Sequence, residues 1–236
     1  MIITLDGPCG SGKSTLAQLL AKRLGFFYIN SGYLYRSVAY VLVKDFGYDY
    51  QQLQAPDVDH IHTILHADHF VYQYADGIAR VYFKNIEITH HLKASTVSDH
   101  ASLISSHLHV RHIIVATQRR LGSMHHLITD GRDGGTEIYP QADFKFYVIA
   151  DDAIRAQRLQ NDAARIGTVL TFEQALQMTQ MRDQRDMNRL ISPLKKAHDA
   201  IVIDTSLQSV HKTLDAMIQI IQKSSRSVEY QNFLRN

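Results

Sequence analysis

The stretch "DGPCGSGKST", residues 6–15, decides the fold class of this 236-residue chain. It contains the pattern G-x-x-x-x-G-K-[ST], in which glycines let backbone N–H groups turn inward around the phosphates of a nucleotide. The run "MIITL" before it predicts a strand, and residues 14–24 after it predict a helix that ends at Gly25. Strand, loop and helix are the context that this phosphate-binding loop requires, so we expect the chain to bind a nucleoside triphosphate.

The residues of this loop have separate chemical roles. Lys13 is expected to reach the β- and γ-phosphate oxygens, and Ser14 is expected to supply a ligand for Mg²⁺. Asp6 or Asp130 would assist at the metal through water. Cys9 most simply fills space on the loop, and a reactive thiol is the second interpretation. The predicted ATP-binding residues are Gly7, Pro8, Cys9, Gly10, Ser11, Gly12, Lys13, Ser14 and Thr15.

The remaining segments alternate between strand and helix patterns. Strands are predicted at 26–30, 125–133, 144–150 and 200–204, and helices at 33–47, 95–121 in two pieces, 151–166, 171–189 and 207–223. Such alternation predicts an α/β fold whose central parallel sheet is covered by helices on both faces. The segments "HFVYQY" (69–74) and "ARVYFKNIEIT" (79–89) instead predict an antiparallel hairpin with its turn at Asp76-Gly77.

Composition narrows the class of protein. The formal charge is +2, 45% of the residues are hydrophobic, and the basic residues are scattered among acidic ones. The chain shows no apolar stretch long enough to span a bilayer and no signal-peptide pattern, so we expect a cytoplasmic protein without membrane or nucleic-acid partners. Cys9 is the single cysteine, which excludes an internal disulfide. Ten of the 14 histidines lie between His60 and His112, and without an HExxH pattern they favour a solvated helix face over a metal site.

Further motifs separate the classes of triphosphate-binding protein. The chain has neither the Asn-Lys-x-Asp pattern of guanine readers nor the LSGGQ-type signature of transporter ATPases. It has arginines near the predicted strand ends, where open parallel sheets bind ligands, and this favours a second anionic substrate. These arginines are Arg36, Arg111, Arg132, Arg155, Arg158, Arg182 and Arg189.

Five motifs together resemble the bacterial cytidylate kinase family. They are "GPCGSGKST", "NSGYLYR" (30–36), "DGRDGGT" (130–136), "RDQRDMNR" (182–189) and "PLKKAHDAIVIDTS" (193–206). The first occurs in many phosphate-loop proteins, whereas the combination of the last three is specific to this family. The resemblance implies transfer of the γ-phosphoryl group of ATP to CMP or dCMP, with Mg²⁺. It also implies a single P-loop kinase domain over 1–225, with an inserted monophosphate-binding subdomain at about 33–108, a lid at about 151–167 and a polar tail over 226–236.

The resemblance also assigns roles to individual residues. It places Ser31, Arg36 and Arg132 at the acceptor phosphate. At the base it places Ser102, Arg111 and Asp133, and at the sugar Arg182 and Asp186. The implied catalytic residues are Lys13, Arg132, Arg158 on the lid helix and Arg189 near the transferring phosphoryl group. We expect a monomer.

The chain departs from the family pattern at two positions. Asn30 stands where the family usually has Asp, and an asparagine there still caps a helix. Gly134 replaces a usual apolar residue, so we expect a looser loop around Arg132 and Asp133.

Donor and acceptor geometry favours cytosine as the base. The Asp133 carboxylate can accept from the cytosine amine, while Arg111 and Ser102 donate to N3 and O2. Uracil would bring an acceptor against Asp133, so UMP is expected to be a poor substrate.

Two other functions remain open at the level of sequence. One is a P-loop kinase of another acceptor: UMP, or a hydroxyl compound as in shikimate kinase. A hydroxyl acceptor needs a base, for which Asp6 is the only evident candidate. The other is an ATP-driven module that binds nucleic acid, for which salt-dependent affinity would be the signature.

Overall fold

The computed structural model describes residues 1–165 and 167–224, so the tail expected over 226–236 lies outside the described residues. The chain divides into two units. The first combines Met1–Ile29, His125–Asn188 and the segment that begins at Ser192. The second combines Asn30–Met124 with Arg189–Ile191, a wider range than the insertion expected at about 33–108. Each unit is described separately below.

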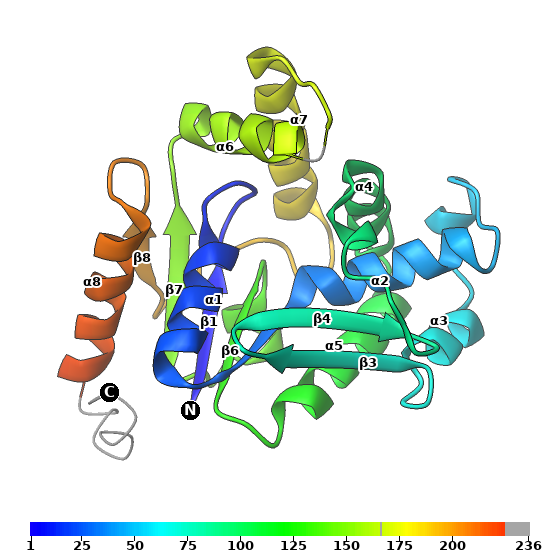
Figure 1. The fold of residues 1–236 in the computed structure, drawn as a ribbon, viewed down its shortest axis with the longest axis horizontal. Coiled ribbons are helices and arrows are strands. Elements are labelled where there is room, and N and C mark those ends of the chain that lie inside the picture. The colour runs from blue at the N-terminus through cyan, green and yellow to red at the C-terminus, as the bar shows by residue number, and fades with distance from the viewer. Residues whose placement is uncertain (166, 225–236) are drawn as a thin grey trace. The chain divides into compact units, whose positions relative to one another are not determined.

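A five-stranded sheet forms the centre of the first unit, in the order β2-β6-β1-β7-β8 (Figure 1). β1 is parallel to both β6 and β7, and β8 is parallel to β7. The interior strand β1 is apolar and buried, with Ile3 and Leu5 at 0% exposure, as expected for a strand covered on both faces. The strands are β1 (Ile2–Asp6), β2 (Phe27–Asn30), β6 (Leu127–Gly131), β7 (Phe144–Ile149) and β8 (Ile201–Asp204).

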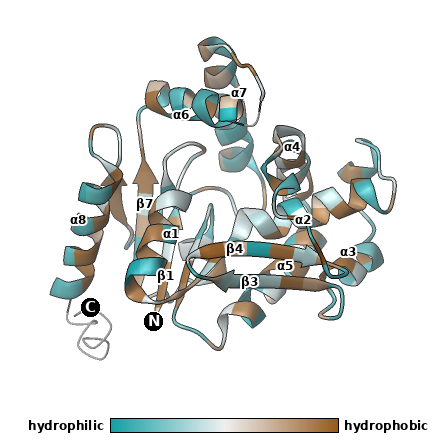
Figure 2. Ribbon diagram, viewed as in Figure 1, coloured by the Kyte–Doolittle hydropathy of each residue, from teal (hydrophilic) through white to brown (hydrophobic). Residues whose placement is uncertain are grey.

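Helices flank this sheet, and the predicted α/β class is confirmed. α1 contacts β1, β6 and α8, and α6 packs against α7. Gly25 ends α1 in the left-handed region at φ 67°, as the sequence predicts. Figure 2 shows long hydrophilic stretches on α6 and α7, in contrast to the hydrophobic strand β7. The helices are α1 (Lys13–Leu24), α6 (Asp152–Arg165), α7 (Phe172–Asn188) and α8 (Val210–Lys223).

The second unit is mainly helical. Asn30 caps α2, because its side-chain oxygen accepts a hydrogen bond from the Tyr33 amide at 3.1 Å. Asn30 therefore acts as the helix N-cap, as expected from the capping chemistry of asparagine. α2 contacts α3, α4 and α5. The helices are α2 (Ser31–Lys44), α3 (Val58–Leu65), α4 (Ser95–Ile104) and α5 (Leu108–Gly122), with short 3₁₀ turns η1 (Gln52–Gln54) and η2 (His91–Lys93).

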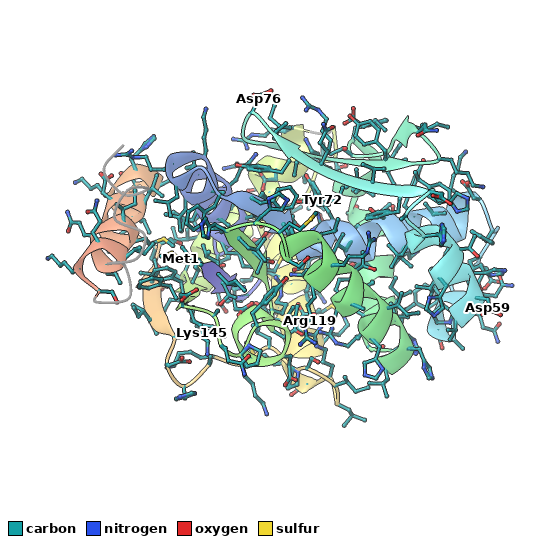
Figure 3. The ribbon with its side chains drawn as sticks, turned by 90° about the horizontal axis from the view of Figure 1, so that it is seen from below. Met1, Asp59, Tyr72, Asp76, Arg119 and Lys145 are labelled. Carbon is teal, nitrogen blue, oxygen red and sulfur yellow. The ribbon has the colours of Figure 1, made fainter. Side chains whose placement is uncertain are left out.

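A small antiparallel sheet completes the second unit. The hairpin of β3 (Phe70–Ala75) and β4 (Ile78–Phe83) turns at Asp76-Gly77 as predicted, and Figure 3 labels Asp76 at this turn. The prediction of one strand over 79–89 is wrong. Lys84 and Asn85 have φ values of 48° and 65°, the geometry of a second two-residue turn, and the chain continues as β5 (Ile86–Glu87).

The histidine-rich segment packs largely through its rings. The His60 ring lies 4.3 Å from the Phe46 ring, and the His91 ring stacks on Tyr40 at 4.9 Å. Within residues 1–165 and 167–224, no three histidine, cysteine or acidic side chains gather closely enough to hold a metal ion. No helix in the same ranges is both long and apolar enough to cross a membrane.

Candidate active site

The phosphate-binding loop between β1 and α1 depends on glycine at two points. Gly7 has φ 153°, and a Cβ there would lie 2.1 Å from the carbonyl oxygen of Val148. Gly12 precedes α1 at φ 85°, in the left-handed region that side chains disfavour. Ser11 is fully buried, and its hydroxyl has no hydrogen-bond partner among the described residues. This strained, desolvated loop suits a phosphate ligand, since N–H groups at a helix N-terminus favour anions.

Lys13 is the first residue of α1 and is buried. Its Nζ donates a hydrogen bond to the Pro8 carbonyl at 2.8 Å. The pKa of Lys13 is lowered to about 7, mainly by burial and to a smaller extent by the nearby cations Arg132 and Arg182. Three basic groups from different parts of the sequence therefore interact in the first unit. Such a concentration of positive charge requires anions to balance it.

Asp130 is the second-last residue of β6 and accepts hydrogen bonds from a serine and a tyrosine hydroxyl. Ser14 Oγ donates to Asp130 Oδ2 at 2.5 Å, and the Tyr28 hydroxyl donates to Asp130 Oδ1 at 2.7 Å. A serine hydroxyl and a carboxylate are the hard oxygen groups that Mg²⁺ prefers, so this pair fits that metal. Sequence reasoning missed Tyr28, because a tyrosine within the strand "FFYIN" looks like any other strand residue.

Asp6, at the end of β1, has a different set of partners. Its Oδ1 accepts from the Gly134 amide at 2.9 Å, and its Oδ2 accepts from the Gly135 amide at 2.7 Å. Burial raises the pKa of Asp6 to about 6, although these two amides act in the opposite direction. Asp6 and Asp130 were equal candidates to assist Ser14, and the hydrogen bond to Ser14 favours Asp130.

The loop that follows Asp133 is attached to β1 by hydrogen bonds. The short π-helical turn η3 (Gly134–Ile138) is tied to β1 through Asp6, and a Cβ at Gly135 would lie 2.9 Å from Thr4 Oγ1. The looser loop expected around Arg132 and Asp133 stays a prediction, and in the structure the loop is hydrogen-bonded to β1 through Asp6.

Arg132, Arg182 and Asp186 form a cluster in the first unit. Arg132 Nε donates to Asp186 Oδ2 at 2.7 Å, and Arg182 Nε lies 3.9 Å from the same oxygen. Asp186 is 4% exposed, so one buried carboxylate orients two guanidinium groups. The structure thus brings together three of the residues assigned to the acceptor nucleotide.

The helix α6 holds the outer part of the phosphate-binding loop. Arg158 donates to the Gly10 carbonyl at 3.2 Å and to the Thr205 carbonyl at 2.7 Å. Arg155 donates to the Cys9 carbonyl at 2.8 Å and forms an ion pair with Asp183. Sequence reasoning counted Arg155 only among the arginines near strand ends and gave no role to Asp183 or Thr205, since each reads as an ordinary helix or strand-end residue.

The second unit contains further residues assigned to the acceptor. Arg111 is 2% exposed, its Cζ lies 5.6 Å from the centre of the Tyr35 ring, and it donates to the Ser105 carbonyl at 3.3 Å. The Ser102 hydroxyl is buried and has no hydrogen-bond partner within the described part of the chain. Buried polar atoms in this state are uncommon in native proteins, and a ligand is one explanation.

The remaining assigned residues are placed as follows. Ser31 is the first residue of α2 and is buried, and Arg36 lies on the same helix with its Cζ 5.9 Å from the Tyr33 ring centre. Asp133 is buried immediately before η3 in the first unit. Arg189 follows α7 directly and belongs to the second unit.

Comparison with known proteins gives consistent matches over the chain. The family described as Cytidylate kinase matches residues 3–223. A cytidylate kinase from Acholeplasma laidlawii (strain PG-8A) is 34% identical over 222 residues, which cover 94% of this chain and 95% of the relative. Another, from Burkholderia vietnamiensis (strain G4 / LMG 22486), is 36% identical over 218 residues, which cover 92% of this chain and 91% of the relative.

A solved structure is similar in fold. The crystal structure of an uncharacterized protein from Eubacterium ventriosum ATCC 27560 matches with a TM-score of 0.50 and 14% identity, covering 95% of this chain and 99% of that one. At that identity the similarity concerns the fold alone. The family match, in contrast, rests on sequence and includes both the phosphate-binding loop and the motif that contains Arg132. This chain belongs to the cytidylate kinase family.

Proposed function

We propose that this protein transfers the γ-phosphoryl group of ATP to CMP or dCMP, giving ADP and CDP or dCDP. The names of its relatives and the motifs of its sequence support this activity. The phosphate-binding loop of the first unit holds the ATP phosphates, and the segment of about 151–167 acts as a lid.

The observation that carries the proposal is the charge around Lys13. Arg132 Nε donates to Asp186 Oδ2 at 2.7 Å, and Arg182 Nε lies 3.9 Å from the same oxygen. Burial, together with these two arginines, lowers the pKa of Lys13. A protein that only hydrolyses a triphosphate has one anion to hold, whereas a monophosphate kinase must hold two anions that repel each other. Three clustered cations suit the second task.

On the donor side, the loop amides and Lys13 bind the ATP phosphates. Positive charge at Lys13 stabilises the charge that develops on the β- and γ-phosphate oxygens as the phosphoryl group is transferred. Arg158 and Arg155 of α6 donate to the Gly10 and Cys9 carbonyls, so a closing lid would act directly on the shape of this loop.

Magnesium is the expected cofactor. Ser14 would hold it, with Asp130 accepting from a bound water or from Ser14 itself. When bound, Mg²⁺ neutralises phosphate charge and fixes the β- and γ-phosphates in one geometry.

On the acceptor side, no general base is required. The second pKa of a phosphate monoester is about 6, so the CMP phosphate is largely ionised near neutral pH. One of its oxygens forms a bond to the γ-phosphorus while the bond from that phosphorus to the β–γ bridging oxygen breaks, and ADP leaves. Arg132, positioned by Asp186, holds the acceptor phosphate, and by family resemblance Ser31, Arg36 and Arg189 assist.

The structure gives less support to the other two functions. A hydroxyl acceptor needs a base, and both carboxylate oxygens of Asp6, the only evident candidate, already accept backbone hydrogen bonds. A nucleic-acid module is disfavoured by a net charge of only +2 with scattered basic residues. We further propose a cytoplasmic monomer whose partners are ATP and CMP or dCMP, and light scattering tests the oligomeric state.

A panel of acceptors tests the proposed function. In a coupled ADP-release assay, kcat/KM is measured for CMP, dCMP, UMP, AMP, GMP and a small hydroxyl acid, with ATP and Mg²⁺ in excess. We expect CMP and dCMP to be good substrates, UMP to be poor, and the remaining compounds to be inactive. Equal use of AMP or UMP, or transfer only to the hydroxyl acid, would overturn the proposal.

The variant Asp133→Asn tests how the base is read. An amide can donate to the O4 atom of uracil where a carboxylate cannot, so the CMP to UMP ratio of kcat/KM should narrow. An unchanged ratio would remove Asp133 from base recognition while leaving the kinase activity in place.

A further inference from the structure

The carboxylate of Asp6 holds a loop that is distant in sequence. Its two oxygens accept hydrogen bonds from the consecutive amides of Gly134 and Gly135, at 2.9 and 2.7 Å. The adjacent strands bring them together, since Asp6 on β1 is paired with Gly131 on β6 in parallel register. The loop that leaves β6 at Gly131 therefore turns back over the end of β1.

These two contacts suit a carboxylate. Each of the two neighbouring N–H groups has an acceptor oxygen of its own, and an ionised aspartate offers both. An asparagine in the same position would accept from one amide and would turn its own NH₂ group toward the other. Asp6 is 4% exposed, so its charge is desolvated, and such a group is normally disfavoured unless hydrogen bonds compensate.

The loop backbone leaves little room for another arrangement. A Cβ at Gly134 would lie 3.1 Å from Asp6 Oδ1, so the backbone directly contacts the carboxylate. On the other side of the turn, the amides of Glu137 and Ile138 donate to the Asp133 carbonyl at 2.9 and 3.2 Å. The backbone of Asp133 is thus held from one side by its own turn and from the other by Asp6.

We propose that Asp6 is a positioning residue for the acceptor nucleotide: it fixes the Gly134 and Gly135 amides and thereby sets the directions in which Arg132 and Asp133 leave the loop. The inference rests on the proposed function, because it takes Arg132 and Asp133 as acceptor-binding residues. Asp6 itself touches no substrate in this account. Its effect is expected on the acceptor and not on ATP.

The variant Asp6→Asn tests this role. Calorimetry measures the Kd of CMP and of ATP separately, without turnover. Because one charge-assisted hydrogen bond to the loop is lost, we expect the Kd of CMP to rise about 10- to 100-fold while that of ATP stays within about threefold. A collapse of the fold would instead weaken both nucleotides together.

Asp143→Asn is the matched control. The Asp143 carboxylate accepts from the Ile2 amide at 2.7 Å, at the opposite end of the same strand from Asp6. The substitution therefore also alters a carboxylate contact to a backbone amide next to β1, but far along the strand from the loop. Both Kd values should stay within about threefold of the parent protein.

Three results would overturn the inference: an Asp6→Asn variant that binds CMP normally, one that loses CMP and ATP affinity equally, or a control that behaves in the same way. If Asp6→Asn does not fold, amide hydrogen exchange of the nucleotide-free parent protein tests the inference instead. We expect protected amides at Gly134 and Gly135, and exchange at the rate of an open loop would contradict the inference. If the parent protein does not phosphorylate CMP, the proposed function is wrong. If the parent phosphorylates CMP but Asp6→Asn binds CMP normally, only this inference is wrong.

Discussion

Asp6 and Asp130 lie at or near the ends of two adjacent parallel strands, yet they bind different kinds of group. Asp6 on β1 accepts from two backbone amides, those of Gly134 and Gly135. Asp130 on β6 accepts from two side-chain hydroxyls, those of Ser14 and Tyr28. A hydroxyl can rotate and turn its oxygen toward a metal ion, whereas a backbone amide is fixed by the chain.

The difference indicates separate tasks for the two carboxylates. Asp130 accepts a hydrogen bond from Ser14, whose hydroxyl can bind Mg²⁺, and we assign Asp130 to the ATP side of the reaction. The hydrogen bonds of Asp6 go to the backbone of a loop that carries acceptor-binding residues, and we assign it to the acceptor side. The predictions below test this separation, from the largest expected effect to the smallest.

Lys13→Met should have the largest effect, because Lys13 interacts electrostatically with both carboxylates. Its charge acts mainly on the transition state, so kcat should fall by about 10³ while the Kd of ATP changes much less. Steady-state kinetics and calorimetry measure the two quantities. Lys22→Met, at an exposed position on the same helix, is the control. A kcat within a few-fold of the parent value would refute the mechanism.

Arg132→Ala should affect the acceptor side alone. The substitution removes a guanidinium from the acceptor phosphate and leaves Asp186 without its 2.7 Å partner. We expect kcat/KM for CMP to fall about 100-fold, with the Kd of ATP within a few-fold of the parent. Arg165→Ala removes an exposed ion pair with Asp162, and it should change neither kcat/KM for CMP nor the Kd of ATP. Equal losses for both nucleotides would contradict the assignment.

Tyr28→Phe should affect the ATP side and only modestly. The substitution removes one of the two hydroxyl groups that donate hydrogen bonds to Asp130, so the carboxylate is less well oriented toward Ser14. The Mg²⁺ concentration for half-maximal activity should rise about three- to tenfold, with CMP binding unchanged. Tyr48→Phe removes a tyrosine hydroxyl that contacts His60 in the second unit and serves as the control. An unchanged Mg²⁺ requirement would remove Tyr28 from the metal side.

The pH dependence of stability should identify Asp6 directly. Its pKa is raised from 3.8 to about 6 in the folded protein, mainly by burial. Between pH 4 and 6 the folded chain therefore holds a proton that the unfolded chain has lost, and the free energy of unfolding falls as the pH rises. Relative to Asp6→Asn, the parent should lose about 2 kcal/mol from pH 4 to pH 7. Urea unfolding at several pH values measures this difference, and a constant or rising difference would be inconsistent with a buried carboxylate.

Sequence patterns were sufficient where the structure is local. The phosphate-binding loop, the helix after it and the alternation of strands and helices follow from glycine spacing and apolar periodicity, which act over a few residues. The turn at Lys84-Asn85 was missed because neither residue is a glycine, although asparagine is one of the few residues that tolerate a left-handed backbone.

Contacts between distant segments could not be predicted in the same way. Whether Asp6 or Asp130 bonds to Ser14 depends on the register of β1 and β6, and 116 positions separate Ser14 from Asp130. Tyr28 was hidden in an apolar strand, and the partnership of Arg155 with Asp183 joins two helices whose relative placement no spacing reveals. For Gly134, the resemblance suggested a loose loop because the sequence does not show which group holds its amide.

The separation of tasks between the two carboxylates is tested most directly by a crossed measurement on Asp6→Asn and Asp130→Asn. For each variant, the Kd of CMP is measured without metal, and the Mg²⁺ concentration that half-saturates ADP binding is measured without CMP. We predict that Asp6→Asn weakens CMP about tenfold or more and leaves the Mg²⁺ midpoint unchanged. Asp130→Asn should raise the Mg²⁺ midpoint and leave CMP binding unchanged. The assignment would be contradicted if either variant changed both the Kd of CMP and the Mg²⁺ midpoint. It would also be contradicted if Asp6→Asn changed only the Mg²⁺ midpoint and Asp130→Asn only the Kd of CMP.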